Sequence, residues 1–173
     1  MRKPLIVYYS RKGENYWNGQ IKNLAKGNTE IVAEMIAGLT GGDLFEVQTV
    51  QDYAADYYAC TDQAKAELQQ NARPALKRLP EHLEQYDTIF VGYPNWWADL
   101  PMAVYSFFDE YDFSGKTIIP FNVHNGSRFS RTIETIQELE PNATVIEDGF
   151  TISEQNVPKA ADDVASWLQE IGY

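Results

Sequence analysis

Short apolar runs alternate with amphipathic segments along the whole chain, and this alternation constrains the fold more than any other feature. The runs that we expect to be strands are residues 4–9, 43–50, 89–91, 116–121 and 143–146, the last resuming at 150–152. The segments with helical spacing lie at 28–40, 57–72, 101–111, 129–139 and 158–171. Alternation of this kind gives a parallel sheet with helices on both faces. The sequence therefore predicts an α/β fold, a single domain over residues 1–173, with a three-layer, doubly wound, five-stranded parallel sheet in the order 2-1-3-4-5.

The predicted strand order also predicts where a ligand would bind. In this order the direction of winding reverses between strands 1 and 3, and ligands bind beyond the carboxyl ends of the strands at such a point. The loops at that edge are residues 10–28, 93–100 and 122–127. We therefore expect the functional site where these three loops meet.

The loop after the third strand contains two adjacent tryptophans, Trp96 and Trp97. The apolar run before them stops at Gly92, and Pro101 suits the first turn of the helix that follows. A loop with two tryptophans needs a physical reason, because an indole ring is costly to leave in water. Two interpretations are open: the rings cap the core from outside, or they form a platform for a flat aromatic ligand.

The loop after the first strand is long, and its glycines and asparagines predict an irregular path. It leads into a helix for which Asn28 is the expected N-cap. The free amides and the dipole of a helix start favour a phosphate, to which Ser10, Asn28 and Thr29 would add donors and Lys12 a charge. The alternative for Asn28 is a plain helix cap. Since neither G-x-x-x-x-G-K-[ST] nor G-x-G-x-x-G occurs, one phosphate beside a flat ring suggests a mononucleotide, and FMN has both groups.

These segments resemble the flavodoxin-like flavoproteins, over essentially the full length of the chain. The phosphate loop of that family resembles residues 9–12 followed by Gly27-Asn28-Thr29-Glu30, with an insertion between them. Residues 92–97 resemble the Gly-Tyr-Pro-x-Trp-Trp signature of one branch, in which this segment lies along the flavin. Residues 112–121 are similar to the fourth strand of that branch, and residues 124–127 to the loop after it.

The resemblance implies an FMN site built from all three loops. Its expected cofactor-binding residues are Ser10, Lys12, Gly27, Asn28, Thr29, Pro94, Asn95, Trp96, Trp97, Ala98, Asn122, His124, Asn125 and Gly126. Backbone groups of residues 94–98 are the expected contacts of flavin N5. His124 is the candidate catalytic side chain, because histidine exchanges a proton near neutral pH; the alternative is a histidine that is hydrogen-bonded for structure. Tyr53, Tyr57 and Tyr58 cover the flavin edge or pack the crossover, and the sequence leaves this choice open.

The composition narrows the classes of partner. A net charge of −11 argues against nucleic acid as a ligand, and no apolar run approaches the length of a membrane span. One cysteine, Cys60, excludes an internal disulfide framework and favours the cytoplasm; we expect it to be a small helix residue. No group of histidine, cysteine and carboxylate residues has the spacing of a metal site.

Three functions remain as hypotheses. The first is an FMN-dependent oxidoreductase, similar to quinone reductases, that takes electrons from NAD(P)H or a protein donor and passes them to a small quinone-like acceptor. The second is an electron carrier between redox protein partners, which the acidic surface favours. The third is a flavin-free binding module that kept the fold. The fold alone does not separate them, and the sequence leaves the oligomeric state open.

Overall fold

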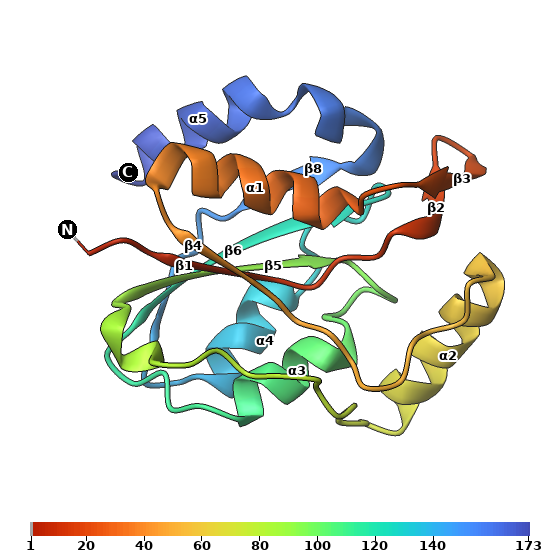
Figure 1. Ribbon diagram of the computed structural model, residues 1–173, viewed down its shortest axis with the longest axis horizontal. Helices are drawn as coiled ribbons and strands as arrows, with labels where there is room; N and C mark the ends of the chain where they lie inside the picture. Colours follow the sequence, from red (N-terminus) through yellow and green to blue (C-terminus); the bar gives the residue numbers. More distant parts are fainter. Residues whose placement is uncertain (1) are drawn as a thin grey trace.

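A computed structural model describes residues 2–173 and shows one mainly parallel sheet between two layers of helices (Figure 1). The sheet has the order β4-β1-β5-β6, and both β7 and β8 pair with β6. Every pairing in this sheet is parallel. Its strands are β1 (Leu5–Tyr8), β4 (Asp43–Glu46), β5 (Thr88–Pro94), β6 (Thr117–His124), β7 (Thr144–Val145) and β8 (Phe150–Ser153). The predicted order 2-1-3-4-5 is confirmed, with β7 and β8 sharing the fifth position because the chain breaks between them.

Two pairs of helices cover the two faces of the sheet. In Figure 1, α1 (Asn28–Thr40) and α5 (Ala161–Glu170) lie on one face, and α3 (Met102–Asp109) and α4 (Thr132–Leu139) lie on the other. Successive side chains of β1 point to opposite faces of the sheet. Ile6 packs in the core under α1 and α5, whereas Leu5 and Val7 pack in the core under α3 and α4. Two 3₁₀ helices, η1 (Leu83–Gln85) and η2 (Glu154–Lys159), connect elements.

The remaining helix, α2 (Tyr57–Gln69), stands beside the carboxyl ends of the strands (Figure 1). Only Cys60 and Ala64 of α2 are buried, as its weak apolar pattern predicted. No helix within residues 2–173 is both long enough and apolar enough to cross a membrane.

The segment between β1 and α1 differs from the prediction. It forms an antiparallel hairpin of β2 (Gly13–Trp17) and β3 (Gln20–Leu24) instead of an irregular loop. Asn18 and Gly19 form its turn with φ of 48° and 85°, so both central residues are left-handed. Asn-Gly is the dipeptide that most favours such a two-residue turn. The same residues that seemed to break periodicity are therefore the turn of a hairpin.

Several element boundaries also differ from the prediction. β5 continues through Tyr93 and Pro94, and β6 continues through Asn122 to His124, because these residues pair with each other and with β8. Pro101 is the N-cap of α3 and not a residue of its first turn. Pro158 lies inside η2, so the last α-helix begins later than the sequence suggested.

We expect two glycine-to-alanine substitutions to change stability in opposite directions. A Cβ at Gly92 would lie 2.1 Å from the ring of Phe121, so Gly92→Ala overpacks the core and should lower the free energy of unfolding by about 1–3 kcal/mol. Gly38 is an exposed residue of α1 with open space around its Cα, so Gly38→Ala should raise that free energy by about 0.5–1 kcal/mol. Urea denaturation of both variants measures the difference. A Gly92→Ala protein as stable as the wild type would contradict the packing described here.

Candidate functional site

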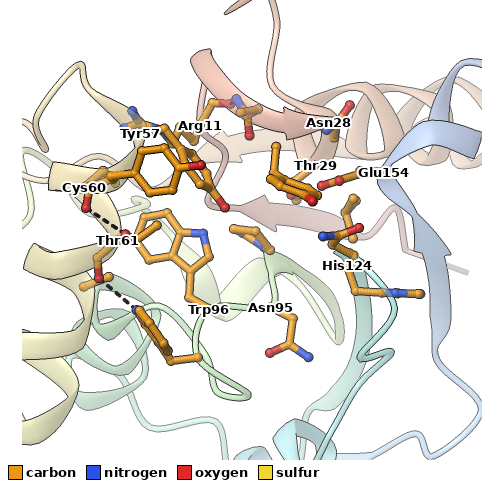
Figure 2. A pocket seen from close by; sticks show the side chains of 18 residues that line it. Arg11, Asn28, Thr29, Tyr57, Cys60, Thr61, Asn95, Trp96, His124 and Glu154 are labelled. Carbon is orange, nitrogen blue, oxygen red and sulfur yellow. Dashed lines mark hydrogen bonds between the residues drawn. The ribbon is translucent and has the colours of Figure 1, made fainter. Parts of the chain in front are cut away.

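A cavity of about 460 Å³ opens at the carboxyl ends of β1, β5, β6 and β8 (Figure 2). This is the size of a pocket for a cofactor or small ligand, and it lies at the edge where the predicted loops meet. Several residues expected from the sequence line it, namely Asn28, Thr29, Pro94, Asn95, Trp96, Trp97, His124 and Asn125. Lining residues that the sequence analysis did not assign to the site are Arg11, Asn15, Tyr16, Cys60, Thr61, Ala64, Val123 and Glu154.

The start of α1 forms one side of this cavity. Gly27 is the N-cap and Asn28 is the first helical residue, so Asn28 is not the N-cap that the sequence suggested. Ser10 Oγ accepts the amide of Glu30 at 3.1 Å, and the Gly27 carbonyl accepts the amide of Ile31. Within residues 2–173, the amides of Asn28 and Thr29 have no acceptor. Two donors at the positive end of a helix dipole therefore remain for an anion.

The residues expected to bind a phosphate are divided between two cavities. Asn28 and Thr29 line the cavity in Figure 2, whereas Ser10, Lys12 and Gly27 line a second cavity. Ser10 Oγ accepts the amide of Glu30, which uses one lone pair of the hydroxyl and not its O–H. The parts of the predicted phosphate site that share the main cavity are thus Asn28 and Thr29 alone.

The double-tryptophan loop is a tight turn held in a strained conformation. Trp96 and Asp99 exchange both backbone hydrogen bonds at 3.0 Å. Trp97 and Ala98 between them have φ of 55° and 61°. Neither residue is glycine, and a left-handed conformation costs a non-glycine residue about 1–3 kcal/mol. Such strain is typical of a loop whose side chains must reach fixed positions.

The turn sends the two indole rings in different directions. Trp96 packs edge-on against Tyr9 and Tyr53, each with ring centroids 5.3 Å away, and also lines the cavity. Trp97 is 48% exposed, and its Nε1 donates to the carbonyl of Thr61 in α2 at 2.9 Å. Trp96 therefore both touches the core and offers a surface to a ligand, while Trp97 joins the loop to α2 at the rim.

The residues at the end of β6 have distinct roles. His124 is buried, and its Nδ1 accepts the amide of Gly126 at 2.8 Å, which leaves the ring proton of the neutral form on Nε2. Burial and the positive charge of Arg128 both lower the pKa of His124. The imidazole is therefore neutral near pH 7 and offers a donor. Asn122 is fully buried and bonded to the Arg128 carbonyl and to Thr151, so it holds the loop and does not line the cavity.

Two further expected residues stay outside the cavity lining. Ala98 occupies the tip of the tight turn, and Gly126 has a φ of 103° in the loop after β6. Their backbone conformations shape the two loops that carry Trp96 and His124. The structure thus gives both residues a role in loop geometry.

Two buried side-chain oxygens in the described residues lack a hydrogen-bond partner, and both belong to residues that line this cavity. They are Asn95 Oδ1 and Glu154 Oε1. The amide nitrogen of Asn95 donates to the Arg128 carbonyl and to Ser130 Oγ, so Oδ1 is the atom of this amide without a hydrogen bond. Buried polar atoms normally have partners. Two residues of the cavity lining therefore each hold a buried oxygen whose hydrogen-bonding capacity is unused.

The hairpin and α2 close the remaining side. Glu14 Oε2 accepts the amide of Tyr57 at 2.6 Å, and the Arg11 guanidinium donates to the carbonyls of Ala54 and Ala55 at 3.0 Å. Tyr57 and Tyr58 line the cavity, whereas Tyr53 packs behind Trp96. The adjacency of Arg11 to Ser10 was the one sequence signal that could have placed Arg11 here.

Cys60 lines the cavity as a thiol and not as a thiolate. Cys60 is buried in α2, and burial raises the pKa of its thiol, so the thiolate form is disfavoured. This placement agrees with the expectation of a small helix residue. Across residues 2–173 there is no group of three or more histidine, cysteine, aspartate or glutamate side chains arranged to hold a metal ion.

Solved structures with this architecture span nearly the whole chain. A candidate flavoprotein from Bacteroides uniformis is 27% identical with a TM-score of 0.78, covering 97% of this chain and 98% of its own. One from Bacteroides eggerthii is 26% identical with a TM-score of 0.72, covering 95% and 99%. A flavoprotein from Lactobacillus acidophilus, solved in complex with FMN, is 21% identical with a TM-score of 0.67 over 95% and 99%, which shows a shared fold.

No curated protein matches the sequence significantly. The family model described as Flavodoxin matches residues 22–171, which include the start of α1, the double-tryptophan loop and the end of β6. The cavity thus lies among segments that the family model covers. It lies beyond the carboxyl ends of the strands, where doubly wound sheets bind their ligands. Since this match covers most of the chain, the protein belongs to the flavodoxin family.

Proposed function

We propose that the cavity binds one FMN and that the protein is an oxidoreductase that passes electrons from a nicotinamide or protein donor to small quinone-like acceptors. The observation that carries the proposal is the coincidence of complementary groups in one cavity. One cavity is lined by the Trp96 ring, by the first residues of α1, whose amides have no acceptor within residues 2–173, and by Asn95 and Glu154, each of which has a buried oxygen without a hydrogen-bond partner. The Lactobacillus acidophilus flavoprotein, which has the same fold, was solved with FMN.

In this proposal each group has a defined task. The amides of Asn28 and Thr29 hold the phosphate, as helix starts do for anions. Trp96 supports the ring, and His124 Nε2 offers a donor. Backbone groups of residues 94–98 remain the expected contacts of N5. Bound FMN supplies the one- or two-electron chemistry.

The rim of the cavity favours a small flat acceptor. Trp97 is 48% exposed and Tyr58 is 63% exposed, and both line the cavity. Exposed aromatic rings at a ligand site gain from stacking with a second flat molecule. A single buried cysteine is consistent with work in a reducing compartment, and we propose the cytoplasm.

The alternative is an electron carrier between redox proteins. A net charge of −11 favours it, since an acidic surface speeds association with a basic partner. The two functions differ in what they need from the protein. An enzyme turns over its acceptor unaided, whereas a carrier needs a separate reductase.

Removing the hydroxyl of Thr29 should weaken FMN binding selectively. Thr29→Val keeps the shape of the side chain but removes a donor to a charged phosphate, a contact worth about 1.5–3 kcal/mol. The affinity for FMN should fall at least about tenfold, and the affinity for riboflavin, which lacks the phosphate, should stay the same. Quenching of flavin fluorescence measures both. Equal losses of affinity for the two ligands would show that the phosphate is not at α1. A wild-type protein that binds neither FMN nor riboflavin would overturn the proposed function.

Replacing Trp97 should impair reduction of a quinone. Loss of an aromatic contact worth about 0.5–1.5 kcal/mol predicts a kcat/KM about two- to tenfold lower for Trp97→Ala in the presence of NADH or NADPH. Trp17→Ala is the matched control, because Trp17 lies on the hairpin and does not line the cavity. Turnover that appears only when a separate reductase is added would assign the protein to the electron carriers.

A further inference from the structure

Glu154 is a buried carboxylic acid in the cavity for which the proposed function gives no role in electron transfer. It follows β8 as the first residue of η2, and it is 9% exposed. Its Oε1 has no hydrogen-bond partner within residues 2–173. Figure 2 shows the carboxyl group directed into the cavity, on the side where Asn28 and Thr29 lie. An unpartnered acid at this position therefore faces whatever occupies the start of α1.

The surroundings of Glu154 favour its neutral form. Burial raises the pKa of Glu154 to about 7, and no neighbouring charge contributes to this shift. The titratable side chains that line the same cavity are Arg11, Tyr16, Tyr57, Tyr58, Cys60 and His124. The Arg11 guanidinium is occupied by carbonyl oxygens of Glu14, Ala54 and Ala55, and His124 is neutral near pH 7. Among the residues that line the cavity, none adds a charge effect to the pKa of Glu154, which burial alone shifts.

A phosphate at the start of α1 and an ionised Glu154 would share one small space. Two negative groups at close range raise the proton affinity of at least one of them. A protonated carboxyl instead has an O–H that can donate to a phosphate oxygen, and such charge-assisted hydrogen bonds are strong. The helix start supplies the amides of Asn28 and Thr29, and a protonated Glu154 adds a third donor.

We propose that Glu154 is the proton-carrying ligand of the phosphate, so that binding of a phosphate-bearing flavin is coupled to uptake of one proton by this carboxyl. The proposal rests on the proposed function, because it takes FMN as the ligand of this cavity. The proton balance is simple: the ionised carboxylate of the free protein takes one proton from solvent, and the new O–H donates to a phosphate oxygen. Riboflavin, which has no phosphate, binds without this step.

The coupling makes FMN affinity depend on pH in a fixed direction. The free carboxyl is mostly protonated below pH 7 and mostly ionised above it, while the bound carboxyl stays protonated. The affinity for FMN should therefore fall about tenfold for each pH unit above 7, since one proton is taken up per ligand. The affinity for riboflavin should not follow that slope.

Isothermal titration calorimetry at pH 8 tests the proposal directly. Repeating the titration in buffers of different ionisation enthalpy gives the number of protons taken up per ligand. We expect about one proton for FMN with the wild type, and none for riboflavin. For Glu154→Gln we expect no uptake, and an FMN affinity at pH 8 at least equal to that of the wild type, because the amide donates without a proton. Glu170→Gln, which changes an exposed residue of α5 outside the cavity, should behave as the wild type.

The outcomes separate this inference from the function on which it rests. FMN binding without proton uptake by the wild type would overturn the role of Glu154 and leave the FMN site intact. Uptake that persists in Glu154→Gln would place the proton on the phosphate and also overturn it. Failure of both FMN and riboflavin to bind the wild type would remove the proposed function, and this inference with it. Thermal unfolding of Glu154→Gln, expected to be at least as cooperative as that of the wild type, checks that the variant is folded.

Discussion

The contact between Gly27 and Ser10 fixes the start of α1 against the end of β1, and the cavity depends on it. A Cβ at Gly27 would lie 2.1 Å from Ser10 Oγ and 2.7 Å from the Arg11 carbonyl, so only glycine allows this approach. The approach lets Ser10 cap the amide of Glu30, while the amides of Asn28 and Thr29, two residues that line the cavity, have no acceptor within residues 2–173. The β2–β3 hairpin can then be inserted between β1 and α1 at modest cost, because closing a loop twice as long costs only about 0.6 kcal/mol more.

The hairpin also has a use at the site. Glu14 of β2 binds the start of α2, and Arg11, just before the hairpin, binds the segment that leads into α2. In turn, the Thr61 carbonyl of α2 accepts the indole N–H of Trp97. This chain of contacts links segments that are distant in sequence into one wall of the cavity. The strained turn at Trp97 and Ala98 fits this arrangement, since it holds Trp96 against the core while Trp97 reaches α2. Strain of this kind persists where the surrounding contacts over-determine a conformation.

The sequence predicted the fold and the cavity edge well, because both follow from local patterns. Alternating strands and helices fix a doubly wound order, and that order fixes where loops meet. The hairpin was missed because Asn18 and Gly19 were interpreted as breaks in periodicity, although together they favour a tight turn. The sequence did not predict the ends of β5 and β6, because Pro94 and Asn122 are residue types that are unfavourable in strands. These residues are in strands because they pair with residues of the neighbouring strand.

The site residues were harder to predict for a physical reason. The role of Ser10 depends on which helix amide lies next to it, and Glu154 belongs to no motif, since its state is set by tertiary burial. A crystal structure of the protein with FMN tests the central claim most directly. The account predicts the phosphate within hydrogen-bond distance of the Asn28 and Thr29 amides and of Glu154, with the ring against Trp96. A phosphate bound in the second cavity, against Ser10 and Lys12, would contradict it.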